Sequence, residues 1–93
     1  MPTFHRKPVD AVIDVRSRLE FWMGHLPGAI CIPVDALPDA LADHPAITRD
    51  SRILVYCASG ARSAAAAATL SSLGYHSVTD GGGIAAAREH FEP

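Results

Sequence analysis

The chain has 93 residues, of which 48% are hydrophobic and 19% are charged, and its formal net charge is −2. This length provides one small core, so we expect a single domain over residues 1–93 rather than a disordered chain. The charge balance and the lack of basic runs argue against a nucleic-acid partner or an anionic membrane surface. No apolar run has the length of a signal peptide or a membrane span, which predicts a cytoplasmic protein.

The first half of the chain, taken in order, predicts two strands and two short helices. Apolar runs of four to six residues, bounded by Pro, Gly or a charged residue, are typical of strands. A helical stretch ends where Gly24 follows it, and Pro38 suits the first turn of a helix. The expected elements are strand 10–15, helix 17–23, strand 29–32 and helix 38–43.

The second half contains the strongest signals. Its first strand is continuously apolar, which indicates burial on both faces as in a parallel sheet. An alanine-rich stretch with high helix propensity then runs to Gly74. The expected elements are strand 52–56, helix 63–73, strand 76–79, turn 81–83 and helix 84–91. Strands alternating with helices predict an α/β fold, a small parallel sheet of four to five strands with helices on both faces.

Cys57 is the best candidate for a functional residue. It ends the apolar strand 52–56, and a short loop containing Gly60 leads from it into the alanine-rich helix. Unpaired N–H groups at a helix start form an anion-binding concavity, and they also favour a thiolate. Gly60 allows a positive φ there. We therefore expect Cys57 to be a nucleophile at the sheet edge where ligands of open α/β sheets bind.

The other cysteine and the histidines point to no further chemistry. Cys31 lies between Ile30 and Ile32, so core packing is expected for it. The two cysteines form no C-x-x-C pair and no disulfide framework, which favours a reducing compartment. The histidines show no metal-ligand spacing, and we expect neither a metal nor any other cofactor.

Four motifs stand out along the chain. An aromatic residue precedes His-aliphatic-Pro-Gly-Ala, a preceding strand ends in Asp-x-Arg, the cysteine loop reads Cys-x-x-Gly-x-Arg, and a Gly-Gly turn follows near the C-terminus. They lie at residues 21–32, 14–16, 57–62 and 80–84. In their sequence and their order along the chain they resemble the signatures of the rhodanese family, over about residues 9–91.

The resemblance implies a rhodanese-like fold and a single-domain sulfurtransferase that carries sulfane sulfur as a persulfide. The donor would be a small sulfur anion such as thiosulfate, and the acceptor a thiol, cyanide or a protein. Cys57 would be catalytic, the loop would bind the donor, and three residues would support it. The loop residues are Ala58, Ser59, Gly60, Ala61 and Arg62, and the supporting residues are Asp14, Arg16 and Ser63.

Two departures from the family pattern affect the expected packing. The strand and helix that usually precede the Asp-x-Arg strand are missing or much reduced here. The last helix has Ala85–Ala87 where many relatives place a tryptophan, which should alter packing beside the loop. The helical spacing of Glu20 from Arg16 would allow a pair between them, which contributes little if it is exposed.

Other functions are compatible with parts of this pattern. Phosphatases and arsenate reductases with a similar cysteine loop have five residues between cysteine and arginine. Here residues 58–61 make four, a cradle suited to one sulfur atom. Rhodanese-like domains also serve as regulatory modules, typically without the cysteine, and a persulfide carrier dedicated to one protein partner has the same motifs as a general sulfurtransferase.

Overall fold

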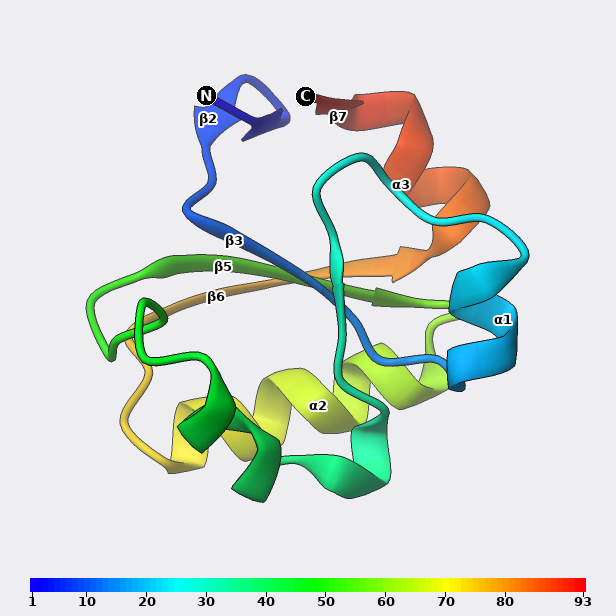
Figure 1. Cartoon of the computed structure of the whole chain (residues 1–93). Helices are drawn as coiled ribbons and strands as arrows, with labels where there is room; N and C mark the ends of the chain where they lie inside the picture. The colour runs from blue at the N-terminus through cyan, green and yellow to red at the C-terminus, as the bar shows by residue number, and fades with distance from the viewer.

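A four-stranded parallel sheet forms the centre of the molecule (Figure 1). The computed structural model describes residues 1–93. The sheet has the order β4-β3-β5-β6, and every neighbouring pair is parallel. Its strands are β3 (Ala11–Asp14), β4 (Ile30–Cys31), β5 (Arg52–Cys57) and β6 (Ser77–Gly83). The predicted α/β fold with a small parallel sheet is confirmed.

Helical elements cover the two faces of this sheet. They are α1 (Arg18–Trp22), the 3-10 helices η1 (Val34–Ala36) and η2 (Asp39–Asp43), α2 (Ala61–Ser72) and α3 (Ile84–His90). In Figure 1, α2 lies on one side of the sheet and α3 on the other. Side chains along β5 alternate between the faces, as the pleat of a strand requires. Val55 and Cys57 belong to the core cluster with Leu70 of α2, and Leu54 and Tyr56 to the cluster with Ala87 of α3.

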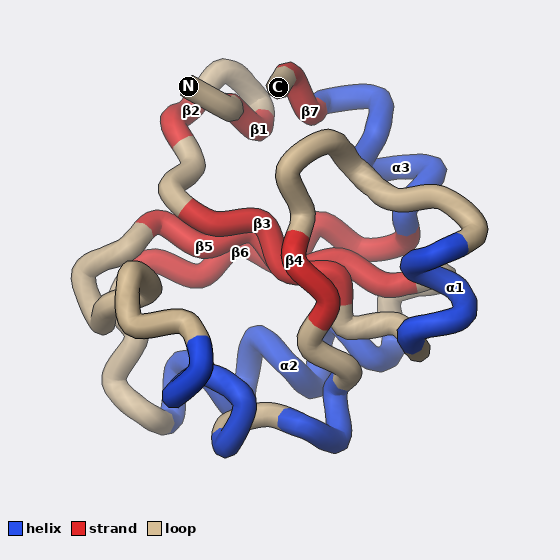
Figure 2. The backbone as a smooth tube through the Cα atoms, in the orientation of Figure 1, coloured by secondary structure: helices blue, strands red, loops and turns tan.

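A second, small sheet joins the two ends of the chain. It is antiparallel, in the order β2-β1-β7, and consists of β1 (Thr3–Phe4), β2 (Lys7–Pro8) and β7 (Phe91–Glu92). The tube view shows both termini at the same end of the molecule (Figure 2). Phe4 and Phe91 are buried in the core cluster on the α3 side. Strand β7 lies where the last predicted helix was expected to end.

Several predicted elements differ in kind or length. Residues 39–43 form a 3-10 helix with Pro38 at its N-cap, where we expected a helix starting at Pro38. The strand predicted at 29–32 is reduced to its two middle residues. Residues 81–83, predicted as a turn, continue β6. The pairing of β5 with β6 shifts register between Val55 and Cys57. Beyond this irregularity, Gly83 of β6 pairs with Cys57 at the end of β5.

One arginine–aspartate ion pair lies at each end of β3. At the carboxyl end, Arg16 donates through Nε and Nη2 to both carboxylate oxygens of Asp14, at 2.7–3.1 Å. Asp14 is fully buried, and Arg16 also donates to the carbonyl of Gly24. At the amino end, Arg52 makes a similar two-pronged pair with Asp10, but this pair is exposed.

The difference in burial predicts different consequences when the arginine is removed. Arg16→Met leaves the buried Asp14 carboxylate without its partner and should lower the free energy of unfolding by about 3 kcal/mol. Arg52→Met leaves its partner in water and should cost much less, because exposed pairs contribute little. Denaturant unfolding of both variants measures this. Equal losses of unfolding free energy in the two variants would contradict the larger contribution of the Asp14–Arg16 pair to stability.

Candidate active site

Cys57 is the last residue of β5, at the carboxyl edge of the sheet between β3 and β6. Its side chain is fully buried. Residues 58–60 turn the chain directly into α2, which begins at Ala61. Gly60 is the N-cap residue and has φ +109°, the positive value expected from the sequence. The thiol therefore faces the N–H groups at the start of a helix.

Hydrogen bonds to the Cys57 sulfur favour the thiolate. The N–H of Gly60 donates to Sγ at 2.9 Å, and the Ser63 hydroxyl oxygen lies 3.5 Å from Sγ. Burial raises the pKa of Cys57 and is the largest single influence on it. Hydrogen bonds from the Ser63 hydroxyl and from the N–H groups of Ser63, Gly60 and Ser59 together outweigh burial, so the pKa of Cys57 is lowered.

The glycines at the end of β6 form the back of the loop. A Cβ placed on Gly83 would lie 2.6 Å from the carbonyl oxygen of Ala58, so only glycine fits there without a shift. The Ser63 hydroxyl oxygen lies 3.1 Å from the carbonyl oxygen of Gly60 and 3.5 Å from that of Gly82, and its single proton turns from these carbonyls to Sγ when Cys57 is a thiolate. The sequence indicated a glycine turn in this region but not its contact with the loop.

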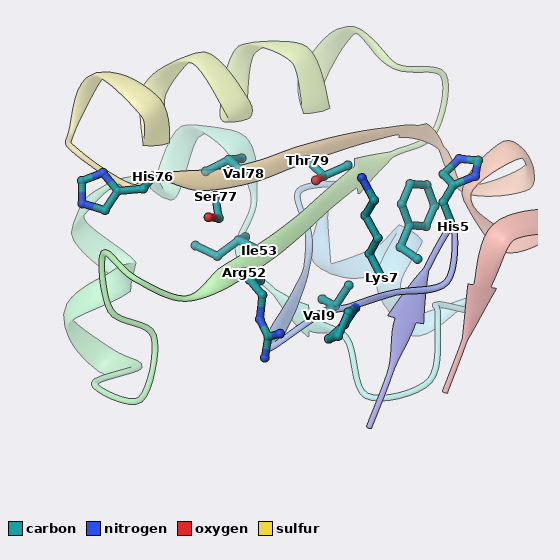
Figure 3. A pocket seen from close by; sticks show the side chains of 11 residues that line it. His5, Lys7, Val9, Arg52, Ile53, His76, Ser77, Val78 and Thr79 are labelled. Atoms are coloured by element: carbon teal, nitrogen blue, oxygen red, sulfur yellow. The ribbon is translucent and has the colours of Figure 1, made fainter.

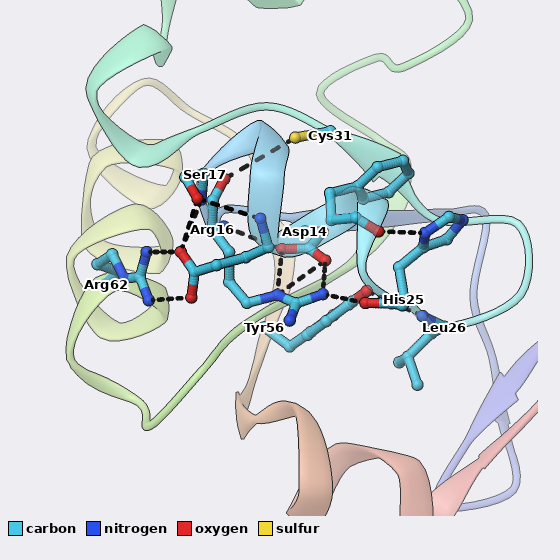
Figure 4. Close-up of polar contacts among 11 residues, drawn as sticks. Asp14, Arg16, Ser17, His25, Leu26, Cys31, Tyr56 and Arg62 are labelled. Carbon is cyan, nitrogen blue, oxygen red and sulfur yellow. Dashed lines mark hydrogen bonds and ion pairs between the residues drawn. The ribbon is translucent and has the colours of Figure 1, made fainter.

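The Arg62 guanidinium pairs with a carboxylate of α1 (Figure 4). Its Nη1 and Nη2 donate to the two carboxylate oxygens of Glu20 at 2.7 and 3.0 Å. The pair of Glu20 with Arg16 that the helical spacing would allow is not formed, because Arg16 is held by Asp14. Glu20 was not predicted as a site residue, since its partner lies 42 positions along the chain.

Asp14 and Arg16 stabilise the same edge of the sheet without hydrogen bonds to Cys57. The Arg16 guanidinium lies 5.8 Å from the centre of the Tyr56 ring, next to Cys57 in the chain. The Tyr56 hydroxyl accepts a hydrogen bond from the Leu26 N–H at 3.0 Å. These contacts, seen in Figure 4, fix the end of β5 against the segment that follows α1. A supporting role, as the resemblance implied, fits this geometry.

Cys31 lies apart from this chemistry. Its side chain is half-buried rather than part of the core, and its Sγ lies 3.8 Å from the carbonyl oxygen of Arg16. Burial, together with the Asp14 carboxylate, raises the pKa of Cys31. At neutral pH this thiol is therefore protonated, in contrast to the anion-stabilising surroundings of Cys57.

A cavity of about 620 Å³ lies at the other end of the strands (Figure 3). Its walls come from the first nine residues and from the amino-terminal parts of β5 and β6, including Lys7, Arg52 and Thr79. Cys57 is not among its lining residues. The structure brings no three His, Cys, Asp or Glu side chains together as a metal site. None of its helices has the length and apolar character needed to cross a bilayer.

Comparison with known proteins identifies the family. Residues 3–86 match the Rhodanese-like domain family, and the chain belongs to it. A sulfurtransferase of Allochromatium vinosum is 35% identical over 83 residues, covering 88% of this chain and 75% of the relative. Thiosulfate sulfurtransferase PspE of Escherichia coli is 35% identical over 72 residues, covering 77% and 68%. A solved rhodanese with anions from E. coli has a TM-score of 0.75 at 32% identity, covering 82% and 88%.

The same domain also occurs within larger proteins. A tRNA uridine(34) hydroxylase of Bacillus velezensis is 34% identical over 80 residues, which are 81% of this chain but 25% of the hydroxylase. The two relatives named as sulfurtransferases are close to this chain in length, and they support a rhodanese-type enzyme.

The bonds to the sulfur predict how the reactivity of Cys57 depends on pH. Ser63→Ala removes one hydrogen bond that lowers the pKa of Cys57, so that pKa should rise and alkylation by iodoacetamide should begin at higher pH. Ser59→Ala is the matched control, because its exposed side chain is lost while its N–H remains. An unchanged alkylation profile in Ser63→Ala would contradict this role.

The contact behind the loop predicts different effects at two adjacent glycines. Gly83 has an ordinary φ of −73°, so Gly83→Ala is limited by space alone and should cost about 1–3 kcal/mol of stability. Gly82 has open space but φ +74°, so Gly82→Ala suffers backbone strain of about 1–2 kcal/mol. Only Gly83→Ala should also displace the loop and raise the pH at which Cys57 is alkylated. Identical alkylation profiles of the two variants would refute the contact.

Proposed function

We propose that this chain is a sulfurtransferase that moves a sulfane sulfur from a donor to a nucleophilic acceptor through a persulfide on Cys57. The observation that carries the proposal is the placement of the Cys57 sulfur, buried and 2.9 Å from the Gly60 nitrogen at the start of α2. A sulfur anion held in this way is both a nucleophile and, after reaction, a protected persulfide. Two free cysteines fit a reducing, cytoplasmic setting.

In the first half-reaction, the Cys57 thiolate attacks the outer sulfur of thiosulfate. A bond forms between Sγ and that sulfur, the sulfur–sulfur bond of the donor breaks, and sulfite leaves with the electron pair. No general base is required, because the hydrogen bonds to Sγ already favour the thiolate. The N–H groups of residues 58–62 then surround the negative outer sulfur of the persulfide.

In the second half-reaction, a thiolate or cyanide attacks the outer sulfur of the persulfide. The Sγ–sulfur bond breaks, the electron pair returns to Cys57, and the acceptor leaves as a persulfide or thiocyanate. Because the enzyme is modified between the two substrates, the kinetics should be ping-pong. The loop residues Ala58, Ser59 and Ala61 are small and uncharged, so they select the acceptor by neither its charge nor its size.

A protein acceptor is supported by the surface of α1. Three apolar residues of this helix and its C-cap, Leu19, Trp22 and Met23, are 66%, 80% and 74% exposed. Exposed apolar residues grouped together are typical of interaction surfaces. The Glu20–Arg62 pair links α1 to the loop that holds Cys57. A carrier that passes its persulfide to another protein is therefore the second candidate function.

The proposal predicts a covalent change that intact mass can detect. Incubation of the reduced protein with millimolar thiosulfate should add one sulfur, about 32 Da, and cyanide should remove it. Cys57→Ser should gain nothing, whereas Cys31→Ser should gain the same mass as the unmodified protein. Absence of the adduct with thiosulfate and with alkyl persulfides alike would refute the proposed function.

A further inference from the structure

Arg62 is the one charged residue of loop 58–62, which surrounds the sulfur, and it forms an ion pair with Glu20. Both terminal nitrogens of its guanidinium donate to Glu20, at 2.7 and 3.0 Å. This fork-to-fork geometry uses two of the five N–H donors of the guanidinium and places a carboxylate charge against its positive charge. The remaining loop residues, 58–61, are uncharged.

Glu20 is fixed by more than this pair. Its Oε1 also accepts from the backbone N–H and the hydroxyl of Ser17, both at 3.0 Å, as part of the capping box that starts α1. The Arg62 guanidinium, followed by the Ser17 N–H, lowers the pKa of Glu20 to about 2. Glu20 therefore stays ionised at physiological pH, and its orientation is set by the helix rather than by Arg62 alone.

The other cations at this edge of the sheet do not replace Arg62. Arg16 is paired with the buried Asp14. Arg18 is exposed on α1, and it is the pKa of Cys31 that its charge lowers. A small dianion approaching Cys57 therefore meets N–H groups but no free cation in the loop, with the Glu20 carboxylate beside Arg62.

From this arrangement we propose that Glu20 is a specificity-determining residue, which disfavours dianionic donors such as thiosulfate and makes persulfides R–S–SH the preferred donors. The inference rests on the proposed sulfurtransferase function and adds the class of donor to it. In the favoured step the Cys57 thiolate attacks the terminal sulfur of R–S–SH. A bond forms between Sγ and that sulfur, the RS–SH bond breaks, and RS⁻ leaves with the electron pair while the proton stays on the transferred sulfur.

Glu20→Gln tests the proposal, because glutamine retains the capping interaction with Ser17 but releases the Arg62 charge. The two probes are thiosulfate and the persulfide of N-acetylcysteine methyl ester, whose organic part is uncharged. The quantity to measure is the ratio of their kcat/KM values for sulfur transfer to cyanide. We expect Glu20→Gln to raise this ratio, thiosulfate over persulfide, about two- to fivefold, the range of a partly exposed ion pair.

Asp10→Asn is the matched control, since it removes an exposed carboxylate from a two-pronged arginine pair at the opposite end of β5. It should leave the ratio unchanged. A purely structural role of Glu20 would change the rates with both donors alike, so an unchanged or lower ratio in Glu20→Gln overturns the proposal. Failure of both donors to load Cys57 of the unmodified protein, seen by intact mass, overturns the proposed function itself.

The unmodified protein provides a second test that needs no variant. With the Arg62 charge neutralised by Glu20, added salt should change kcat/KM for thiosulfate little. A free cation at the loop would attract the dianion, and salt would then reduce kcat/KM steeply. A steep decrease in the unmodified protein contradicts the inference, whereas its appearance only in Glu20→Gln supports it.

Discussion

The hydrogen bonds between the helix start and the Cys57 sulfur are the interaction on which the rest of this structure depends. A buried sulfur anion is unfavourable unless donors replace the water that it loses. Here the compensation comes from neutral groups, the N–H groups of the loop and the Ser63 hydroxyl. For these to converge, β5 must end where α2 begins, and Gly60 must take its positive φ. One core cluster holds β5 against α2, and the other packs the opposite face of β5 against α3.

Close backbone packing limits what the surrounding sequence can contain. The loop is short, and its Ala58 carbonyl lies against the backbone of β6 at Gly83. A side chain at position 83 would displace the loop from the sheet and lengthen the hydrogen bonds from its N–H groups to the Cys57 sulfur. The glycine at position 83 therefore sets the position of the cysteine loop, although it makes no contact with the sulfur itself. Ala87, fully buried on the other face of the sheet, packs in the core cluster that contains Tyr56.

Local signals in the sequence were sufficient to predict the parallel sheet, the position of Cys57 and the conformation of Gly60. Each of these follows from neighbours within a few residues: an apolar run, a tight loop and a helix-forming stretch. The partner of Arg62 was not predictable, because Glu20 comes from a distant segment and competes with a nearer candidate, Arg16. The strands β1, β2 and β7 were missed because each has only two residues, too few to show the alternating pattern of a strand. The 3-10 helix at 39–43 shows the limit of helix signals in a stretch this short.

The pairing of β1 with β7 has a consequence for how the chain can be rearranged. Thr3 lies opposite Glu92, so the two ends of the polypeptide are adjacent in space. They belong to the small antiparallel sheet, which is separate from the parallel sheet that contains Cys57. A short linker between the ends would close the chain with little distortion, and new ends could be opened in an exposed loop. Circular permutation and fusion to other domains at this end are thereby compatible with an unaltered cysteine loop.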